Sequence, residues 1–231
     1  MVAGVLFVVT HVTSVAALAL YGPVLNHSDY IVGSGPDTQV LLGALLEVVL
    51  ALAIVGTAVA LFPVVKRQNE GVALGYVGLR TLEAGVIAVG VVPLLTVVTL
   101  RQDLTETAGA DAITLGSALV AFHNWTFLIG PSFVLGTNTV LLACLLYRSG
   151  LVPRFIPVLG LVGGPLVFAS GAAQMFGLYE QISVWAAITA VPVFAWEICL
   201  ALYLIVRGFR PSAAARLNTA PVVAGAQPVA V

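Results

Sequence analysis

The apolar residues of this chain fall into six long runs, and most polar residues lie between those runs. The runs cover residues 2–25, 40–65, 71–100, 113–147, 155–176 and 182–206. A helix needs roughly 20 apolar residues to cross the hydrocarbon of a membrane, whereas a barrel strand needs roughly 10 residues of alternating polarity. Because the runs are long and continuous, they predict an all-α fold, an integral membrane bundle of six transmembrane helices.

The fourth run is longer than one crossing requires, and Gly130-Pro131 interrupts it near its middle. Proline lacks a backbone N–H and clashes with the preceding helical turn, so it bends or ends a helix. Two crossings within this run would separate Arg148 and Arg154 from the other basic residues. We therefore predict one crossing that is kinked or broken at Gly130-Pro131.

The composition excludes an ordinary soluble domain. Of the 231 residues, 60% are hydrophobic and 8% are charged, whereas about a quarter of the residues in a soluble domain are charged. We expect a transmembrane domain over residues 1–208 and a flexible cytoplasmic tail over residues 209–231. With 9 Lys and Arg against 10 Asp and Glu, the chain lacks the basic surface of a nucleic-acid-binding protein. Its apolar runs make the lipid bilayer the expected partner.

The basic residues between the runs lie almost entirely on one predicted side of the membrane. That side collects Lys66, Arg67, Arg148, Arg154, Arg207, Arg210 and Arg216. The opposite side has Arg101 alone. Cytoplasmic loops are enriched in Lys and Arg, so the asymmetry predicts that both termini of the six-helix bundle are cytoplasmic.

Several motifs resemble a bacterial family of polytopic membrane proteins. They are Tyr21-Gly-Pro-Val-Leu, the run from Asp37 to Glu47, Gly56 to Pro63, Leu100 to Asp103, His123-Asn-Trp-Thr-Phe, Leu146 to Pro153 and Gly177 to Glu180. From the first run to about Pro211, the chain is similar to the domain of unknown function 4386 family. The resemblance implies a multi-pass protein of the bacterial inner membrane, and it implies no particular activity.

Ionisable residues occur inside five of the six runs, at similar depths when counted from the run ends. The candidate set is His11, Glu47, Arg80, Glu83, His123 and Glu197, with Asn124 beside His123. A charged side chain at the bilayer centre costs roughly 2.5–3.5 kcal/mol, so we predict that these side chains meet in one interior cluster. Three carboxylates face one arginine, so the cluster requires a bound proton or a cation.

Each candidate also has a structural interpretation. Arg80 and Glu83 are three residues apart on one helix face and form a local ion pair in the simplest interpretation. Glu47 has an alternative role as a hydrogen-bond partner of a neighbouring helix. His11 lies among hydroxyl residues and is more typical of a structural histidine. Asn138 is interpreted as an interhelical hydrogen bonder.

Three function classes remain open. The first is binding or transport of a small ligand or ion, linked to protons, because transporters place ionisable residues at membrane depth. The second is an intramembrane metal enzyme of the Zn²⁺ type, with ligands drawn from His11, His123, Glu47, Glu83 and Glu197. The third is a structural or regulatory membrane partner. No motif indicates an organic cofactor. The sequence leaves open whether a divalent metal binds and whether the protein is an enzyme.

The charge asymmetry yields a topology prediction. A reporter fused to the C-terminal tail should read as cytoplasmic, and one inserted near Ser34 should read as external. The measurement is reporter activity in intact cells, with the two fusions serving as mutual controls. An external C-terminus would contradict the six-helix topology.

Overall fold

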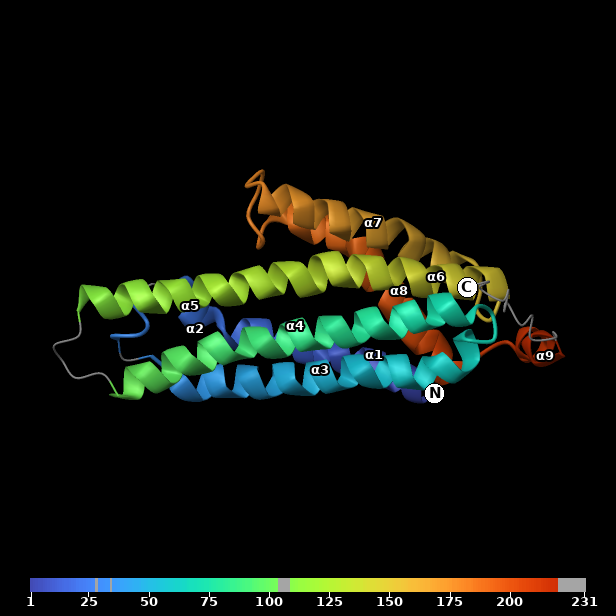
Figure 1. Ribbon diagram of the computed structural model, residues 1–231, viewed down its shortest axis with the longest axis horizontal. Helices are drawn as coiled ribbons and strands as arrows, with labels where there is room; N and C mark the ends of the chain where they lie inside the picture. Colours follow the sequence, from blue (N-terminus) through green and yellow to red (C-terminus); the bar gives the residue numbers. More distant parts are fainter. Residues whose placement is uncertain (28, 34, 104–108, 220–231) are drawn as a thin grey trace, which may run out of the picture.

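The computed structural model describes residues 1–27, 29–33, 35–103 and 109–219, and within these ranges it contains helices and no strands (Figure 1). The first half forms α1 (Val2–Leu20), α2 (Gly22–Asn26), α3 (Asp37–Val65) and α4 (Glu70–Asp103). The second half forms α5 (Ala110–Leu128), the π-helix η1 (Ile129–Val134), α6 (Leu135–Ser149), α7 (Phe155–Met175), α8 (Val184–Val206) and α9 (Pro211–Thr219). Six segments are long and apolar enough to cross a membrane, so the predicted all-α, six-helix fold is confirmed.

The helices form an elongated bundle in which the N-terminus and α9 lie at the same end (Figure 1). Helix α3 packs against both α1 and α4, and α4 packs against the continuous helix formed by α5, η1 and α6. Helix α7 packs on α6 and α8, and α8 packs on α1. Toward the opposite end, α7 and α8 diverge from α5, so their connection lies part-way along that helix (Figure 1).

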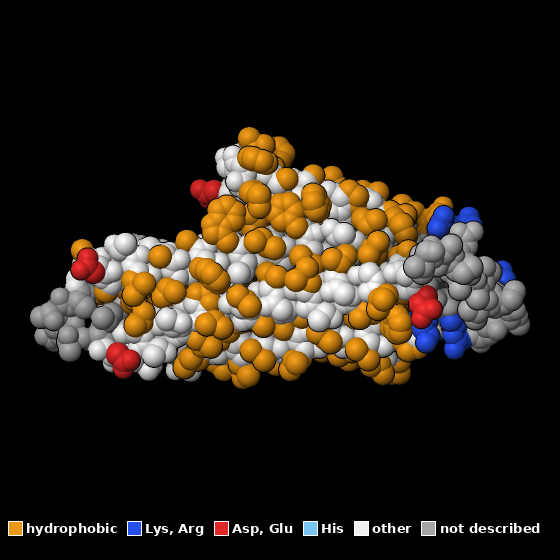
Figure 2. All heavy atoms as spheres, viewed as in Figure 1, with side chains coloured by type: hydrophobic (Ala, Val, Ile, Leu, Met, Phe, Trp, Pro, Cys, Tyr) orange, Lys and Arg blue, Asp and Glu red, His pale blue; other side chains and the backbone are white. Residues whose placement is uncertain are grey.

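The end that carries the N-terminus and α9 is rich in basic side chains, and we call it the basic end. Figure 2 shows Lys and Arg gathered there, with apolar side chains covering the flank between the two ends. All six crossing segments expose large apolar residues on their outer faces. These are surfaces that hydrocarbon can cover, because lipid tails offer no partner to polar groups. The predicted cytoplasmic position of the basic end stays a prediction.

The fourth crossing is one helix, and its interruption is the π-helical segment Ile129–Val134. Pro131 lies in this segment, where the wider turn accommodates a residue that lacks the backbone N–H. Arg148 consequently lies in the last turn of α6, which ends at the basic end (Figure 1). The prediction of a single crossing is confirmed, whereas the helix does not break at Gly130-Pro131 but continues through a π-helical turn.

The segment after Gly208 begins with structure that the sequence does not predict. Helix α9 follows Arg210, whose backbone N–H donates to the Leu151 carbonyl at 2.9 Å. Ala213 is buried against the core of the basic end. The first part of the predicted tail therefore packs on the bundle, while residues 220–231 lie outside the described residues.

At the other end, the connection between α2 and α3 is tied to the end of α4. Arg101 pairs with Asp37 and donates to the Gly33 carbonyl at 2.8 Å. Tyr30 lies beneath the guanidinium and donates its hydroxyl to Asp37 at 3.1 Å. Burial, followed by the hydrogen bond to Asp37, raises the pKa of Tyr30 above its usual value, so the phenol keeps the proton that it donates.

Close approach between α7 and α8 depends on the absence of a side chain at Gly163. A Cβ atom at this position would lie 2.5 Å from the backbone nitrogen of Val193, a distance that neither helix can relieve by moving a flexible side chain. Small residues allow helices in membranes to approach until their backbones touch. Gly163 therefore sets the spacing of the α7–α8 pair.

We predict that Gly163→Ala lowers the free energy of unfolding by roughly 1–3 kcal/mol, because the added methyl group overpacks the interface. The measurement is thermal or denaturant unfolding of the purified protein in detergent. Gly78→Ala is the matched control, since a Cβ atom at Gly78 meets no atom within 4 Å. Equal stability of the two variants would contradict this account of the interface.

Candidate functional site

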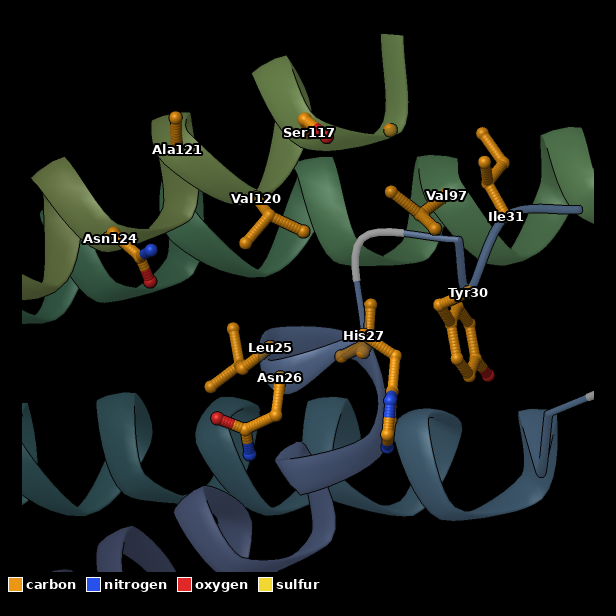
Figure 3. A pocket seen from close by; sticks show the side chains of 12 residues that line it. Leu25, Asn26, His27, Tyr30, Ile31, Val97, Ser117, Val120, Ala121 and Asn124 are labelled. Atoms are coloured by element: carbon orange, nitrogen blue, oxygen red, sulfur yellow. The ribbon is translucent and has the colours of Figure 1, made fainter. Parts of the chain in front are cut away.

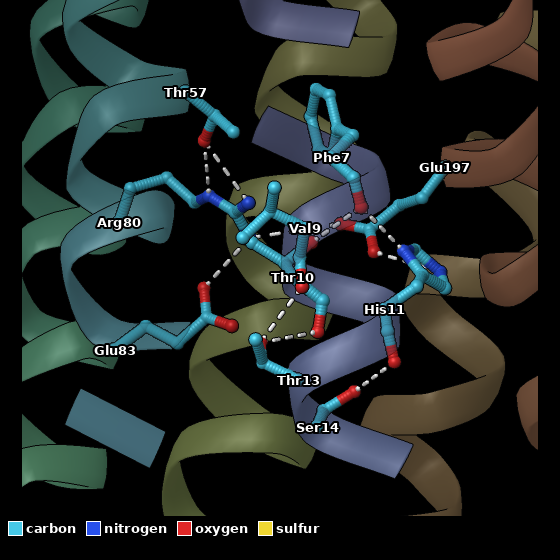
Figure 4. Close-up of polar contacts among 10 residues, drawn as sticks. All are labelled: Phe7, Val9, Thr10, His11, Thr13, Ser14, Thr57, Arg80, Glu83 and Glu197. Atoms are coloured by element: carbon cyan, nitrogen blue, oxygen red, sulfur yellow. Dashed lines mark hydrogen bonds and ion pairs between the residues drawn. The ribbon is translucent and has the colours of Figure 1, made fainter. Parts of the chain in front are cut away.

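The guanidinium of Arg80 lies at the centre of a buried polar network (Figure 4). Only 2% of the Arg80 surface is exposed. Its Nη1 atom lies 3.1 Å from Glu83 Oε2 and 3.6 Å from Glu197 Oε1. Its Nε and Nη2 atoms donate to Thr57 Oγ1 at 3.3 and 3.1 Å. With two further members described below, the arginine network comprises His11, Thr57, Arg80, Glu83, Asn138 and Glu197.

Glu83 is held from two directions. It accepts from Arg80 on its own helix, and it accepts from Asn138 Nδ2 on α6 at 2.7 Å. Both Glu83 and Asn138 are buried. Two donors on one carboxylate oxygen favour its ionised form, so Glu83 is the fixed counter-ion of Arg80.

Glu197 is held differently, because its second neighbour is a histidine. Glu197 Oε2 lies 3.5 Å from His11 Nε2, and the other ring nitrogen, Nδ1, lies 2.9 Å from the Phe7 carbonyl oxygen. A carbonyl only accepts, so Nδ1 carries a hydrogen. A neutral His11 would then turn a lone pair toward a carboxylate. One proton, on either His11 or Glu197, converts this repulsive contact into an ion pair or a hydrogen bond.

With no ligand bound, that proton balances the charges of the network. Arg80 contributes one positive charge, and Glu83 and Glu197 contribute two negative charges. A proton shared by His11 and Glu197 brings the sum to zero. Low dielectric makes an unbalanced buried charge expensive, so the neutral arrangement is the stable one in hydrocarbon.

A cavity of about 230 Å³ adjoins the network. Its polar lining includes His11, Ser14, Arg80, Glu83 and Glu197. The rest of the lining is mainly aliphatic, with Phe194 from α8, which also packs edge-on against the His11 ring. We call this space the arginine cavity.

Glu47 and His123 form a second polar site, separate from the arginine network. Tyr21 donates its hydroxyl to Glu47 Oε2 at 3.0 Å, and the Tyr21 ring meets the His123 ring edge-on at 5.4 Å between centroids. His123 Nδ1 lies 2.8 Å from the Gly90 carbonyl oxygen, so it donates there. Helix α5 comes this close because Gly90 has no side chain, and a Cβ atom would collide with Thr126.

An apolar layer separates the two polar sites. It consists of Leu50, Ala51, Ile54, Ala84 and Ile87. On α3 it lies between Glu47 and Thr57, and on α4 it lies between Glu83 and Gly90. The single cluster expected from the sequence is therefore divided: His11, Arg80, Glu83 and Glu197 lie together, while Glu47 and His123 lie beyond this layer.

Asn124 belongs to neither polar site. Its side chain lines a cavity of about 300 Å³ between α2 and α5, together with Asn26 and His27 (Figure 3). It also lines a cavity of about 580 Å³ that reaches the α7–α8 connection. The Asn124 carbonyl accepts a hydrogen bond from Gln181 Nε2 of that connection at 3.1 Å.

The proposed metal ligands do not gather. Among the described residues, no group of three or more His, Cys, Asp or Glu side chains has the geometry to hold a metal ion. His11, Glu83 and Glu197 lie in the arginine network, but the Arg80 guanidinium sits between the two carboxylates. His123 and Glu47 lie in the other site.

A comparison with protein families places residues 2–208 in one match, the domain of unknown function DUF4386. The chain belongs to the DUF4386 family. Comparisons with curated proteins and with solved structures return no match. The DUF4386 match contains both polar sites and ends before α9.

Sequence reasoning missed two residues that complete the sites of this DUF4386 protein. Thr57 supplies the acceptor for two Arg80 donors, and Tyr21 supplies the donor to Glu47. Thr57 lies 23 residues before Arg80 on a different helix, and this spacing does not predict that the two side chains meet. Tyr21 lies near the end of its run, where tyrosine is typical of the membrane interface.

We predict that Arg80→Leu destabilises the DUF4386 protein by about 3–5 kcal/mol, because it leaves Glu83 and Glu197 buried without their cation. Unfolding of the purified protein in detergent measures the loss. Arg101→Leu is the matched control, since the side chains of its ion pair with Asp37 are 13% and 26% exposed and its removal leaves one partly solvated carboxylate, so the loss should be smaller.

A second variant tests the cause of this loss. Adding Glu83→Gln to Arg80→Leu removes one of the two uncompensated charges, so the double variant should recover part of the lost stability. An Arg80→Leu protein as stable as the Arg101→Leu control would show that the network does not depend on its guanidinium.

Proposed function

We propose that this membrane protein binds a small ligand in the arginine cavity and couples binding to the movement of one proton on the His11–Glu197 pair. Coupled binding of this kind is the elementary step of proton-linked transport. We further propose that the protein lies in the inner membrane of a bacterium with both termini in the cytoplasm, which the charge asymmetry supports.

One observation carries the proposal: the two partners that share the proton both line the cavity. The side chains of His11 and Glu197 are 11% and 13% exposed, whereas those of Arg80 and Glu83 are 2% and 4% exposed. The proton therefore lies at the cavity side of the network, where a bound molecule would meet it. Arg80 and Glu83 form the fixed side.

The structural alternative accounts for less of this arrangement. A network that only fixes helix rotation is satisfied by buried, fully paired groups such as Arg80, Glu83, Thr57 and Asn138. It requires neither a cavity nor a histidine whose second nitrogen faces a carboxylate. The metal-enzyme alternative would require the Arg80 guanidinium to leave the space between the carboxylates.

We predict that the wild-type protein releases one proton from this pair as pH rises, and that Glu197→Gln removes this titration. The measurement is infrared difference spectroscopy over a pH series, following carboxylic-acid and imidazolium bands. Glu197→Gln keeps the shape of the side chain, so the fold should persist, as judged by thermal unfolding.

Glu47→Gln is the matched control, because it makes the same change in the other polar site. It should leave the His11–Glu197 titration in place. Absence of any titration that Glu197→Gln removes would overturn the proposed function. One equivalent of a bound divalent metal per chain in elemental analysis, lost in Glu197→Gln, would favour the metal-enzyme alternative instead.

A further inference from the structure

We infer that the ligand of the arginine cavity is an amphipathic cation, whose positive group takes the place of the shared proton beside Glu197. The inference rests on the proposed function and adds the chemical class of the ligand. It follows from which charges of the network are enclosed and which face the cavity.

The charge available to a ligand is negative. The charged and titratable groups that face the His11–Glu197 pair are Arg80 and Glu83 of α4, with Tyr76 one turn farther from the cavity. Helices α3 and α6 contribute Thr57 and Asn138, and the sequence of α7 contains no charged residue. Without its proton, the network thus carries one net negative charge. A bound cation restores neutrality as the proton leaves to water.

An anion would find no free donor of comparable strength. Arg80 already donates to Thr57 and Glu83, lies against Glu197, and has the Phe7 ring 5.4 Å from its Cζ atom. To bind an anion, the guanidinium would have to leave partners that it holds in a low-dielectric interior. That exchange leaves a carboxylate uncompensated, so it is unfavourable.

The rest of the cavity suits an apolar body. Aliphatic side chains of the apolar layer, Leu50, Ile54 and Ile87, form one wall. The volume of about 230 Å³ equals that of about eight water molecules in the liquid. Few polar atoms line the cavity, so that many water molecules could not all be hydrogen-bonded there. A compact apolar group therefore fills the space at a lower free-energy cost than water.

The cavity reaches the lipid-facing surface between α1 and α8. Val15 of α1 and Phe194 of α8 line it, and they are 63% and 51% exposed. Both lie in membrane-spanning helices, so this opening faces hydrocarbon rather than water. A molecule with an apolar body can reach Glu197 by this route, and the Phe194 ring lies where it can contact a cationic group.

Three probes of 11 non-hydrogen atoms each separate charge from shape: benzyltrimethylammonium, the neutral neopentylbenzene and the anionic phenylmethanesulfonate. We expect the purified protein to bind the cation most tightly, with release of about one proton per molecule into weak buffer. Linkage requires that its affinity then rise up to about tenfold per pH unit wherever the pair is protonated. Calorimetry in buffers of different ionisation enthalpy measures both quantities without any substitution.

Glu197→Gln should weaken benzyltrimethylammonium binding at least about tenfold and abolish proton release. Glu47→Gln should change neither. Tighter binding of the neutral or anionic probe, or binding of none of the three, would overturn the cationic class. The proposed function is judged separately, because the infrared titration of the unliganded protein does not depend on any probe.

Discussion

Burial of the Arg80 guanidinium is the constraint on which the rest of the bundle depends. A guanidinium remains charged under all ordinary conditions, so it must be compensated where it lies. Thr57 of α3, Glu83 of α4 and Glu197 of α8 provide the direct partners. Asn138 of α6 and His11 of α1 then hold the two carboxylates. Five of the six crossings therefore have their rotation fixed by one charge, and α7, which has no charged residue, is positioned by backbone contact at Gly163.

The same constraint leaves one carboxylate more than the arginine can neutralise, and the location of this excess determines what the site can do. Glu83 accepts from two donors, Arg80 and Asn138, and neither donor titrates near neutral pH. Glu197 has a long contact to Arg80 and a histidine on its other side. Compensation that is complete at Glu83 and incomplete at Glu197 divides the network into a fully paired half and a partly paired half. A purely structural network has no reason for such a division, because uniform pairing costs less.

The six crossings, the interrupted fourth helix and the inward-facing charges could be predicted because they follow from hydrophobic run length and from the cost of charge in lipid. The division into two sites could not be predicted, because depth counted from the ends of each run is not depth along the bundle when the helices differ in length. Helices α3, α4 and α5 extend past α7 and α8 at the far end (Figure 1). Counted from the basic end, Arg80 lies 10 residues into α4 and Glu197 lies 9 residues from the end of α8. Glu47 lies 18 residues from the end of α3, about 12 Å farther along the bundle at 1.5 Å per residue.

The apolar layer also affects how water and protons could move between the two polar sites. Water needs two to four polar partners to remain in a protein interior, and the layer between the two sites is formed by aliphatic side chains of α3 and α4. On α3 and α4, aliphatic side chains therefore separate the level of the His11–Glu197 pair from that of Glu47. In the proposed function, the ligand reaches Glu197 through the arginine cavity, whose opening lies between α1 and α8. Passage to the other polar site would require α3 and α4 to separate at Ala51 and Ala84, where short side chains now let the two helices pack closely. A carrier needs such a closed layer beside its binding site, because a continuous polar path would let protons cross without the ligand.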